Sequence, residues 1–175
     1  MESTLKNIVL VGAMGSGKTT VGRRLAYELN QKFFDTDHEI INKTGVTIDH
    51  IFDIEGEEGF RKRESKILEN LCQMSNIILA TGGGIVILPK NREILKNAGM
   101  VVYLFSTVDQ LLRRTAKSKT RPLLENSTDR RKTITELLEA RDVYYREVAS
   151  IVVDSTGKNL QEVINIIKRE TENVD

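Results

Sequence analysis

The stretch LVGAMGSGKTT, residues 10–20, decides the fold of this chain. It places three glycines in front of Lys18 and Thr19, which matches the pattern G-x-x-x-x-G-K-[ST]. Glycine loses more backbone entropy on folding than other residues and packs no side chain, so such a run indicates a ligand close to the backbone. Successive N–H groups in this kind of loop form an anion-binding concavity, which the N-terminus of the next helix reinforces. The stretch therefore predicts a loop, between a strand and a helix, that binds the phosphates of a nucleotide.

Each part of this loop has an expected role. Lys18 places a positive charge near the β- and γ-phosphates, so we expect it to act in catalysis as well as in binding. Thr19 offers a hydroxyl to Mg²⁺, which prefers hard oxygen ligands. The loop residues expected to contact the nucleotide are Gly15, Ser16, Gly17, Lys18, Thr19 and Thr20.

Short apolar runs alternate along the chain with segments of helical pattern. The strands are predicted at residues 7–13, 32–37, 76–81, 100–105 and 150–156. The helices are predicted at residues 17–30, 89–96, 108–116, 133–149 and 159–170, with helical pieces in 38–71 broken at Gly45 and at 55–59. Strands that alternate with helices predict a five-stranded parallel sheet flanked by helices on both faces. The expected fold is an α/β three-layer sandwich, built as one domain over residues 1–175.

The composition excludes several classes of protein. A formal net charge of +1 lacks the basic excess of a nucleic-acid or membrane-surface binder. No apolar run reaches the roughly 18 residues that a transmembrane helix needs. Cys72 is the one cysteine, so no internal disulfide can form, which indicates a reducing, cytoplasmic compartment. The small size and the lack of an obvious apolar patch favour a monomer.

Two carboxylates stand at the end of the second predicted strand, in FFDTD. In open α/β sheets, ligands collect at the carboxyl ends of the strands. Strand alternation would place Asp35 and Asp37 on the same side. Asp35 can then help to hold Mg²⁺, while Asp37 accepts a hydrogen bond from an attacking hydroxyl and takes its proton. The alternative is an Asp pair that caps the next helix.

Three glycines and two arginines indicate how the acceptor is bound. Gly82, Gly83 and Gly84 follow the predicted strand at 76–81, where their N–H groups can bind an anionic or hydroxylated substrate; a bare tight turn is the alternative. The arginine candidates are Arg61, in EEGFRKRE, and Arg141, in LLEARDVYYREVA. Each offers a planar fork that pairs with a carboxylate, although an arginine on a helix is also common on a solvated face.

A basic segment, residues 113–132, is interrupted by Pro122. It predicts a mobile lid at about 117–132 that closes over the nucleotide, excludes water and brings charge to the γ-phosphate. The alternative is a solvated run of charge. Its basic residues include Arg114, Lys117, Lys119, Arg121, Arg130 and Arg131.

Taken in order and spacing, these motifs resemble those of the shikimate kinase family. The matching stretches are GAMGSGKTT, FFDTD, FRKRE, ATGGG, RRT…RPLL and R…YYREVA…VVDST, which span about residues 6–170. The resemblance implies a P-loop NTPase fold of the nucleoside monophosphate kinase type. It also implies transfer of the ATP γ-phosphoryl group to the 3-hydroxyl of shikimate, in the chorismate pathway of aromatic amino-acid biosynthesis.

The resemblance further implies a role for each matching residue. Asp37 would contact the acceptor hydroxyls, and Asp35 and Thr19 would serve Mg²⁺. The acceptor carboxylate would be held by Arg61, Gly83 and Arg141. The remaining ATP contacts would come from Arg121 in the lid, which would also act in catalysis, from Arg114 on the adenine side, and from Lys158. Lys158 stands where some relatives have an arginine, and it lacks the planar stacking surface of one.

Other readings remain open at this point. A gluconate-type sugar-acid kinase would share the phosphate-binding loop and would also need arginines for a carboxylate. A nucleoside monophosphate kinase would need a richer set of arginines for an acceptor phosphate. A GTP-binding switch would need an Asn-Lys-x-Asp motif after a late strand, which is absent here. A regulatory ATP-binding module would leave Asp37 and the lid without a role.

Overall fold

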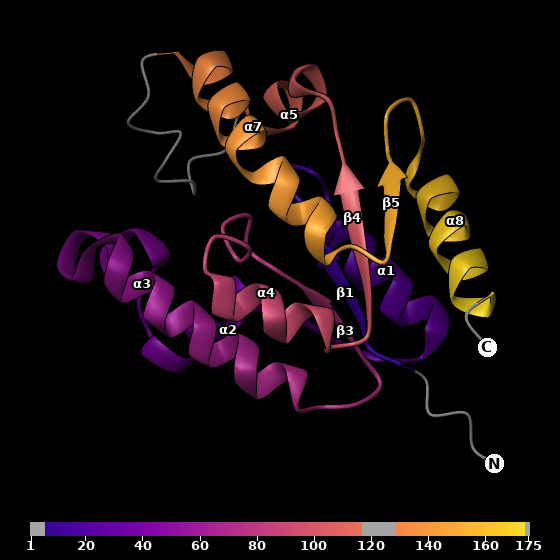
Figure 1. Ribbon diagram of the computed structural model, residues 1–175, viewed down its shortest axis with the longest axis horizontal. Coiled ribbons are helices and arrows are strands. Elements are labelled where there is room, and N and C mark those ends of the chain that lie inside the picture. The colour runs from indigo at the N-terminus through magenta and orange to yellow at the C-terminus, as the bar shows by residue number, and fades with distance from the viewer. Residues whose placement is uncertain (1–5, 117–128, 174–175) are drawn as a thin grey trace.

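The computed structural model describes residues 6–116 and 129–173. Five parallel strands form one sheet in the order β2-β3-β1-β4-β5, which confirms the predicted sheet (Figure 1). The strands are β1 (Ile8–Val11), β2 (Lys32–Asp35), β3 (Ile77–Ala80), β4 (Met100–Phe105) and β5 (Ile151–Asp154).

Helices connect the strands and cover both faces of the sheet (Figure 1). They are α1 (Lys18–Leu29), α2 (Thr36–Thr44), α3 (Ile48–Cys72), α4 (Pro89–Lys96), α5 (Val108–Thr115), α7 (Arg130–Val148) and α8 (Leu160–Glu172). Among the described residues, no helix is both long and apolar enough to cross a bilayer.

The strands are buried because helices pack on each side of them. Along β1, Val9 and Val11 belong to the core shared with α2, α3, α4 and α7, whereas Ile8 and Leu10 belong to the core shared with α1 and α8. Burial of one such side chain contributes about 1.5–3 kcal/mol. The expected three-layer sandwich is therefore confirmed, with a separate core on each face.

The sheet order brings three of the predicted motifs to one edge. The central strand β1 pairs with β3, and β3 pairs with β2, with Leu10 and Asp35 both in register with Ala80. The phosphate-binding loop, the two acids and the glycine turn at residues 82–84 follow these strands directly. They therefore meet at the carboxyl edge, where ligands bind in open α/β sheets.

The end of β2 differs from the expectation. The strand ends at Asp35 and α2 begins at Thr36, so Asp37 lies in the first turn of a helix. The Oδ1 of Asp35 accepts hydrogen bonds from the backbone N–H groups of Asp37 (3.0 Å) and His38 (3.2 Å), and so caps α2. The prediction from strand alternation is therefore wrong; the turn into the helix brings both acids to the same pocket.

The predicted helix breaks are confirmed. Gly45 caps the C-terminus of α2 with a φ of 72°. Within α3, Gly56 has a non-helical conformation that kinks the helix, inside the predicted break at residues 55–59.

The C-terminal limit of the predicted lid needs correction. Arg113 and Arg114 lie in α5, within the helix predicted at residues 108–116, but α7 begins at Arg130, three residues before the predicted start. The reason is Asp129, whose side chain accepts a hydrogen bond from the N–H of Lys132 and caps the helix. Arg130 donates to the carbonyl of Thr115, and Arg131 pairs with Asp109 at 2.7 Å, so these two arginines join α7 to α5. The remainder of the lid, including Lys117, Lys119 and Arg121, lies outside the described residues.

Candidate active site

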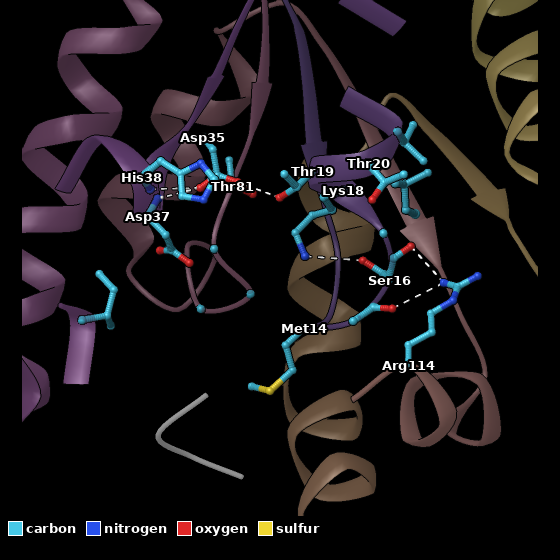
Figure 2. A pocket seen from close by; sticks show the side chains of 18 of the residues that line it. Met14, Ser16, Lys18, Thr19, Thr20, Asp35, Asp37, His38, Thr81 and Arg114 are labelled. Carbon is cyan, nitrogen blue, oxygen red and sulfur yellow. Dashed lines mark hydrogen bonds between the residues drawn. The ribbon is translucent and has the colours of Figure 1, made fainter. Parts of the chain in front are cut away.

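A pocket of about 750 Å³ opens at the carboxyl edge of the sheet. Figure 2 shows Asp37 and Lys18 projecting into it from α2 and α1. It is also lined by the phosphate-binding loop, by the glycine turn and by residues of α3, α5, α7 and α8. Of the predicted site residues within the described chain, the pocket is lined by Gly15, Ser16, Gly17, Lys18, Thr19, Thr20, Asp35, Asp37, Arg61, Gly83, Arg114, Arg141 and Lys158.

The phosphate-binding loop needs glycine at two positions for different reasons. At Gly12, a Cβ would lie 2.7 Å from the carbonyl oxygen of Leu104, so only glycine lets the loop pass this close to β4. Gly17 precedes α1 with a φ of 92°, in the left-handed region that favours glycine, and it offers no side chain to cap the helix. The first N–H groups of α1 are thus left for a ligand, and the positive end of its dipole points at the pocket.

The ammonium group of Lys18 lies inside this loop. It donates to the carbonyl oxygens of Gly12 (2.7 Å) and Ala13 (2.9 Å) and to the Oγ of Ser16 (3.4 Å). Carbonyl oxygens hold the charge in place without neutralising it. Lys18 therefore presents a fixed positive charge to anything bound by the loop.

Thr19 and Asp35 form a pair suited to a hard cation. The hydroxyl of Thr19 donates to the Oδ2 of Asp35 at 2.7 Å, which brings two oxygen ligands together beside the loop. Residues 6–116 and 129–173 contain no group of three or more His, Cys, Asp or Glu side chains that could hold a metal alone. Mg²⁺ usually takes one or two carboxylates and completes its shell with water and phosphate oxygens. The pair therefore fits a magnesium ion that arrives with a nucleotide.

One carboxylate oxygen of Asp37 accepts no hydrogen bond from the described residues. This atom, Oδ1, is fully enclosed. Burial and the nearby charge of Asp35 raise the pKa of Asp37, and the charges of Lys18 and Arg61 oppose this. The carboxylate of Asp37 also lines the pocket beside Lys18, so a hydroxyl bound there could donate to it. Asp37 is thus placed to hold a hydroxyl and to receive its proton.

Arg61 is buried on α3 and held by two acids of the same helix. Its Nη1 lies 2.8 Å from the Oε1 of Glu64, and its Nη2 lies 3.3 Å from Glu57. Glu64 is completely buried, and its Oε2 has no partner in the described part of the chain. Burial raises the pKa of Glu64 to about 7, an effect that the charge of Arg61 opposes.

The raised pKa of Glu64 predicts how stability depends on pH. Between the ordinary pKa of 4.5 and about 7, the folded protein binds more protons at this site than the unfolded chain. Stability from this group is therefore greatest at low pH and is lost as the pH rises through about 7. Glu64→Gln cannot lose a proton, so from pH 5 to pH 8 we expect it to gain about 2–3 kcal/mol in unfolding free energy relative to wild type. Urea unfolding at both pH values measures this.

Glu57→Gln is the matched control, because Glu57 pairs with the same arginine from an exposed position. Its unfolding free energy should follow that of the wild type across the same pH range. Parallel profiles for wild type and Glu64→Gln would show that the folded protein does not protonate Glu64 in this window.

Arg141 and the glycine turn meet on the other side of the pocket. Arg141 is buried on α7, and a Cβ on Gly83 would lie 3.6 Å from its Nη1. The neighbouring Gly84 lies against Arg61, because a Cβ there would be 2.3–2.5 Å from three guanidinium atoms. The structure thus places both predicted arginines beside the turn, with neither on a solvated face.

Two further cations lie near the loop. The Nη1 of Arg114 donates to the carbonyl oxygens of Gly15 (3.4 Å) and Ser16 (3.1 Å), which fixes α5 against the loop. Lys158 donates to the carbonyl of Asp154 at 2.9 Å, at the rim formed by β5 and α8. Both line the pocket on the side away from Asp37.

Three further residues next to the predicted site residues were missed by the sequence analysis. Glu64 and Tyr145 are buried among the site residues, and the hydroxyl of Thr36 accepts the N–H of Gly82 at 3.0 Å. A signal existed for two of them, because Glu64 follows Arg61 by three residues and Tyr145 follows Arg141 by four. Helical residues at these spacings are neighbours.

Comparison with known proteins shows which family the chain belongs to. A family model described as shikimate kinase matches residues 14–172. A shikimate kinase from Thioalkalivibrio sulfidiphilus is 49% identical over 163 residues, which cover 93% of this chain and 85% of that protein. The chain belongs to the shikimate kinase family. It is therefore a P-loop phosphotransferase with an alcohol acceptor, which uses ATP as co-substrate together with Mg²⁺.

Solved structures agree with this membership of the shikimate kinase family. The shikimate kinase from Acinetobacter baumannii, solved in complex with shikimate, has a TM-score of 0.95 at 45% identity, covering 98% of this chain and 96% of that one. A gluconokinase from Sinorhizobium meliloti has a TM-score of 0.59 at 22% identity, so its likeness shows only a shared fold.

Proposed function

We propose that this chain transfers the γ-phosphoryl group of ATP to the 3-hydroxyl of shikimate. The observation that carries the proposal is the content of one pocket. Lys18 in the phosphate-binding loop, the carboxylate of Asp37 and the buried guanidinium groups of Arg61 and Arg141 all line it. A small acid with several hydroxyls needs such an arrangement, a carboxylate for the hydroxyl and cationic forks for the acid group.

In the proposed reaction, the residues of the chain position the reactants and stabilise charge. The loop amides and Lys18 hold the β- and γ-phosphates. Asp37 orients the acceptor hydroxyl toward the γ-phosphorus and takes its proton as the new O–P bond forms. The bond from the γ-phosphorus to the β–γ bridging oxygen breaks, and ADP leaves. Arg61, Arg141 and the N–H of Gly83 hold the acceptor carboxylate.

The remaining predicted roles concern the nucleotide and its metal. Thr19 and Asp35 would hold Mg²⁺, which neutralises phosphate charge when it is bound. Arg114 and Lys158 would contact ATP from α5 and from the start of α8. The part expected of Arg121 in the lid stays a prediction.

A coupled assay for ADP release tests the proposal directly. The purified protein receives ATP and Mg²⁺ with shikimate, gluconate or a panel of nucleoside monophosphates. Of these acceptors, we expect only shikimate to support turnover. Turnover with gluconate would favour the sugar-acid kinase alternative, and a folded protein that leaves shikimate untouched would refute the proposal.

Gly84→Ala should weaken binding of the acid specifically. The added Cβ would overlap the guanidinium of Arg61, which Glu64 and Glu57 prevent from moving away freely. We expect the KM for shikimate to rise about tenfold or more, because a misplaced charged hydrogen bond loses roughly 1.5 kcal/mol or more. The KM for ATP should stay unchanged, which initial-rate kinetics can measure.

A double variant shows whether the clash is the cause. In an Arg61→Ala background the guanidinium is gone, so the further change Gly84→Ala should cost little. If the loss of shikimate affinity in the double variant equals the sum of the losses in the two single variants, the steric explanation is wrong. The effect of Gly84→Ala would then lie in the backbone of the turn.

We also infer a small-molecule acceptor with no nucleic-acid or membrane partner, a monomeric state and a cytoplasmic location. The near-neutral net charge of the chain supports the first of these expectations. Light scattering after gel filtration tests the second.

A further inference from the structure

Tyr145 joins the two groups that are expected to grip the acceptor acid. It lies one helical turn after Arg141 on α7, and its side chain is completely buried. Its hydroxyl donates to the carbonyl oxygen of Gly83 at 2.5 Å. Burial raises the pKa of Tyr145 to about 12, and the positive charge of the neighbouring Arg141 acts in the opposite direction. Tyr145 therefore anchors the glycine turn to α7, the helix that carries Arg141.

The glycine turn is fixed at two points. On the side of α2, the N–H of Gly82 donates to the hydroxyl of Thr36 at 3.0 Å. On the side of α7, the hydroxyl of Tyr145 holds the next carbonyl along the chain. Between them, Gly83 is closely flanked, because a Cβ there would lie 3.2 Å from the backbone N of Met14 and 3.6 Å from the Nη1 of Arg141. The hydrogen bond from Tyr145 thus fixes the position of the glycine turn relative to Arg141.

We infer that Tyr145 is a positioning residue for the acceptor carboxylate. By holding the Gly83 carbonyl from the same helix that carries Arg141, it fixes the spacing between the backbone of Gly83 and the guanidinium of Arg141 before the acid arrives. A carboxylate then meets both groups without rearrangement, and preorganisation of this kind increases affinity because less order has to be created on binding. The inference rests on the proposed function, because it assumes that the acceptor is an acid bound at this place.

Tyr145→Phe removes the hydroxyl and keeps the ring that packs against Tyr103, with ring centres 5.0 Å apart. The Gly83 carbonyl loses its donor, so the glycine turn loses its anchor to the helix that carries Arg141. We expect the KM for shikimate to rise about five- to tenfold, as the loss of one hydrogen bond allows. The kcat should stay within about twofold, and the KM for ATP should not change.

Two other tyrosines serve as matched controls. The hydroxyl of Tyr103 donates to Asp142 at 2.7 Å and also joins α7 to the sheet, but it does not contact the glycine turn. Tyr144 neighbours Tyr145 on α7 and stacks under Arg92, whose Cζ lies 4.2 Å from the ring centre. Tyr103→Phe and Tyr144→Phe should both keep the wild-type KM for shikimate. Assays run below the melting temperature of every variant, as read by circular dichroism.

The methyl ester of shikimate separates positioning of the carboxylate from a general structural effect. The ester lacks the negative charge, so Arg141 and the backbone of Gly83 have no carboxylate to bind. With the ester, kcat/KM of the wild type should fall, and the ratio of wild type to Tyr145→Phe should shrink toward one. An equal ratio for acid and ester would overturn the inference, since Tyr145 would then act on the fold alone.

The outcomes also separate this inference from the proposed function. A wild type that phosphorylates shikimate, beside a Tyr145→Phe variant with unchanged KM, overturns the inference alone. A wild type that neither binds nor phosphorylates shikimate overturns both. A raised KM for shikimate in Tyr145→Phe, with wild-type values in the two control variants, supports the inference.

Discussion

Replacing Asp37 with asparagine should lower kcat by about 10²- to 10⁴-fold, the range that a positioned general base contributes. The side chain keeps its shape, but it can no longer accept a proton from the acceptor hydroxyl. The carboxylate lines the pocket beside Lys18, where the acceptor hydroxyl would bind. Because Lys18 and the loop are untouched, the affinity for ATP should remain close to that of the wild type.

Steady-state kinetics and nucleotide binding by calorimetry measure the two parts of this prediction. Asp53→Asn, at an exposed position on α3, is the control for loss of one negative charge and should be neutral. Turnover of Asp37→Asn at the wild-type rate would remove Asp37 from the mechanism. A fall in ATP affinity as large as the fall in kcat would instead indicate a damaged phosphate site.

Local patterns were enough to predict the fold. The five apolar runs became the five strands of the sheet, and the loop at residues 12–17 lies between β1 and α1 as its motif requires. α4 and β4 have the predicted bounds. These features depend on residues close together in the chain, so the sequence carries the information directly.

The incorrect boundaries arise from helix capping. Asp35 ends a strand and caps the next helix at once, so a strand pattern continued through FFDTD runs two residues too far. Asp129 starts α7 inside a polar, basic stretch that resembles a loop in composition. Asp is a preferred N-cap residue, so this signal was present and was outweighed by composition.

The parts of the site that sequence could not predict depend on burial. Spacing alone cannot distinguish a buried charged face from a solvated one, so Arg61 and Arg141 could be named as candidates but not brought together. Their burial follows from how α3 and α7 pack over the glycine turn. Glu64 and Tyr145 become relevant only after that packing places them beside these arginines.

Removing either buried arginine should raise the KM for shikimate about a hundredfold. Truncating one partner of a buried, hydrogen-bonded charge pair costs roughly 2–5 kcal/mol, much of it from the charge left unpaired. Arg61→Ala would leave both the acceptor carboxylate and Glu64 without their partner, since Arg61 lies 2.8 Å from Glu64. Arg141→Ala would remove the fork on the opposite side of the turn. In both variants kcat at saturating shikimate should fall much less than kcat/KM.

Initial-rate kinetics over a wide range of shikimate concentration measure this effect. Arg63→Ala is the matched control, because Arg63 lies two residues from Arg61 on α3 and pairs at 2.6 Å with Glu55 outside the site. Arg61→Ala combined with Glu64→Gln removes the unpaired acid, so it should regain stability without regaining affinity. A shikimate KM that stays at the wild-type value in both alanine variants would mean that these two arginines do not hold the carboxylate.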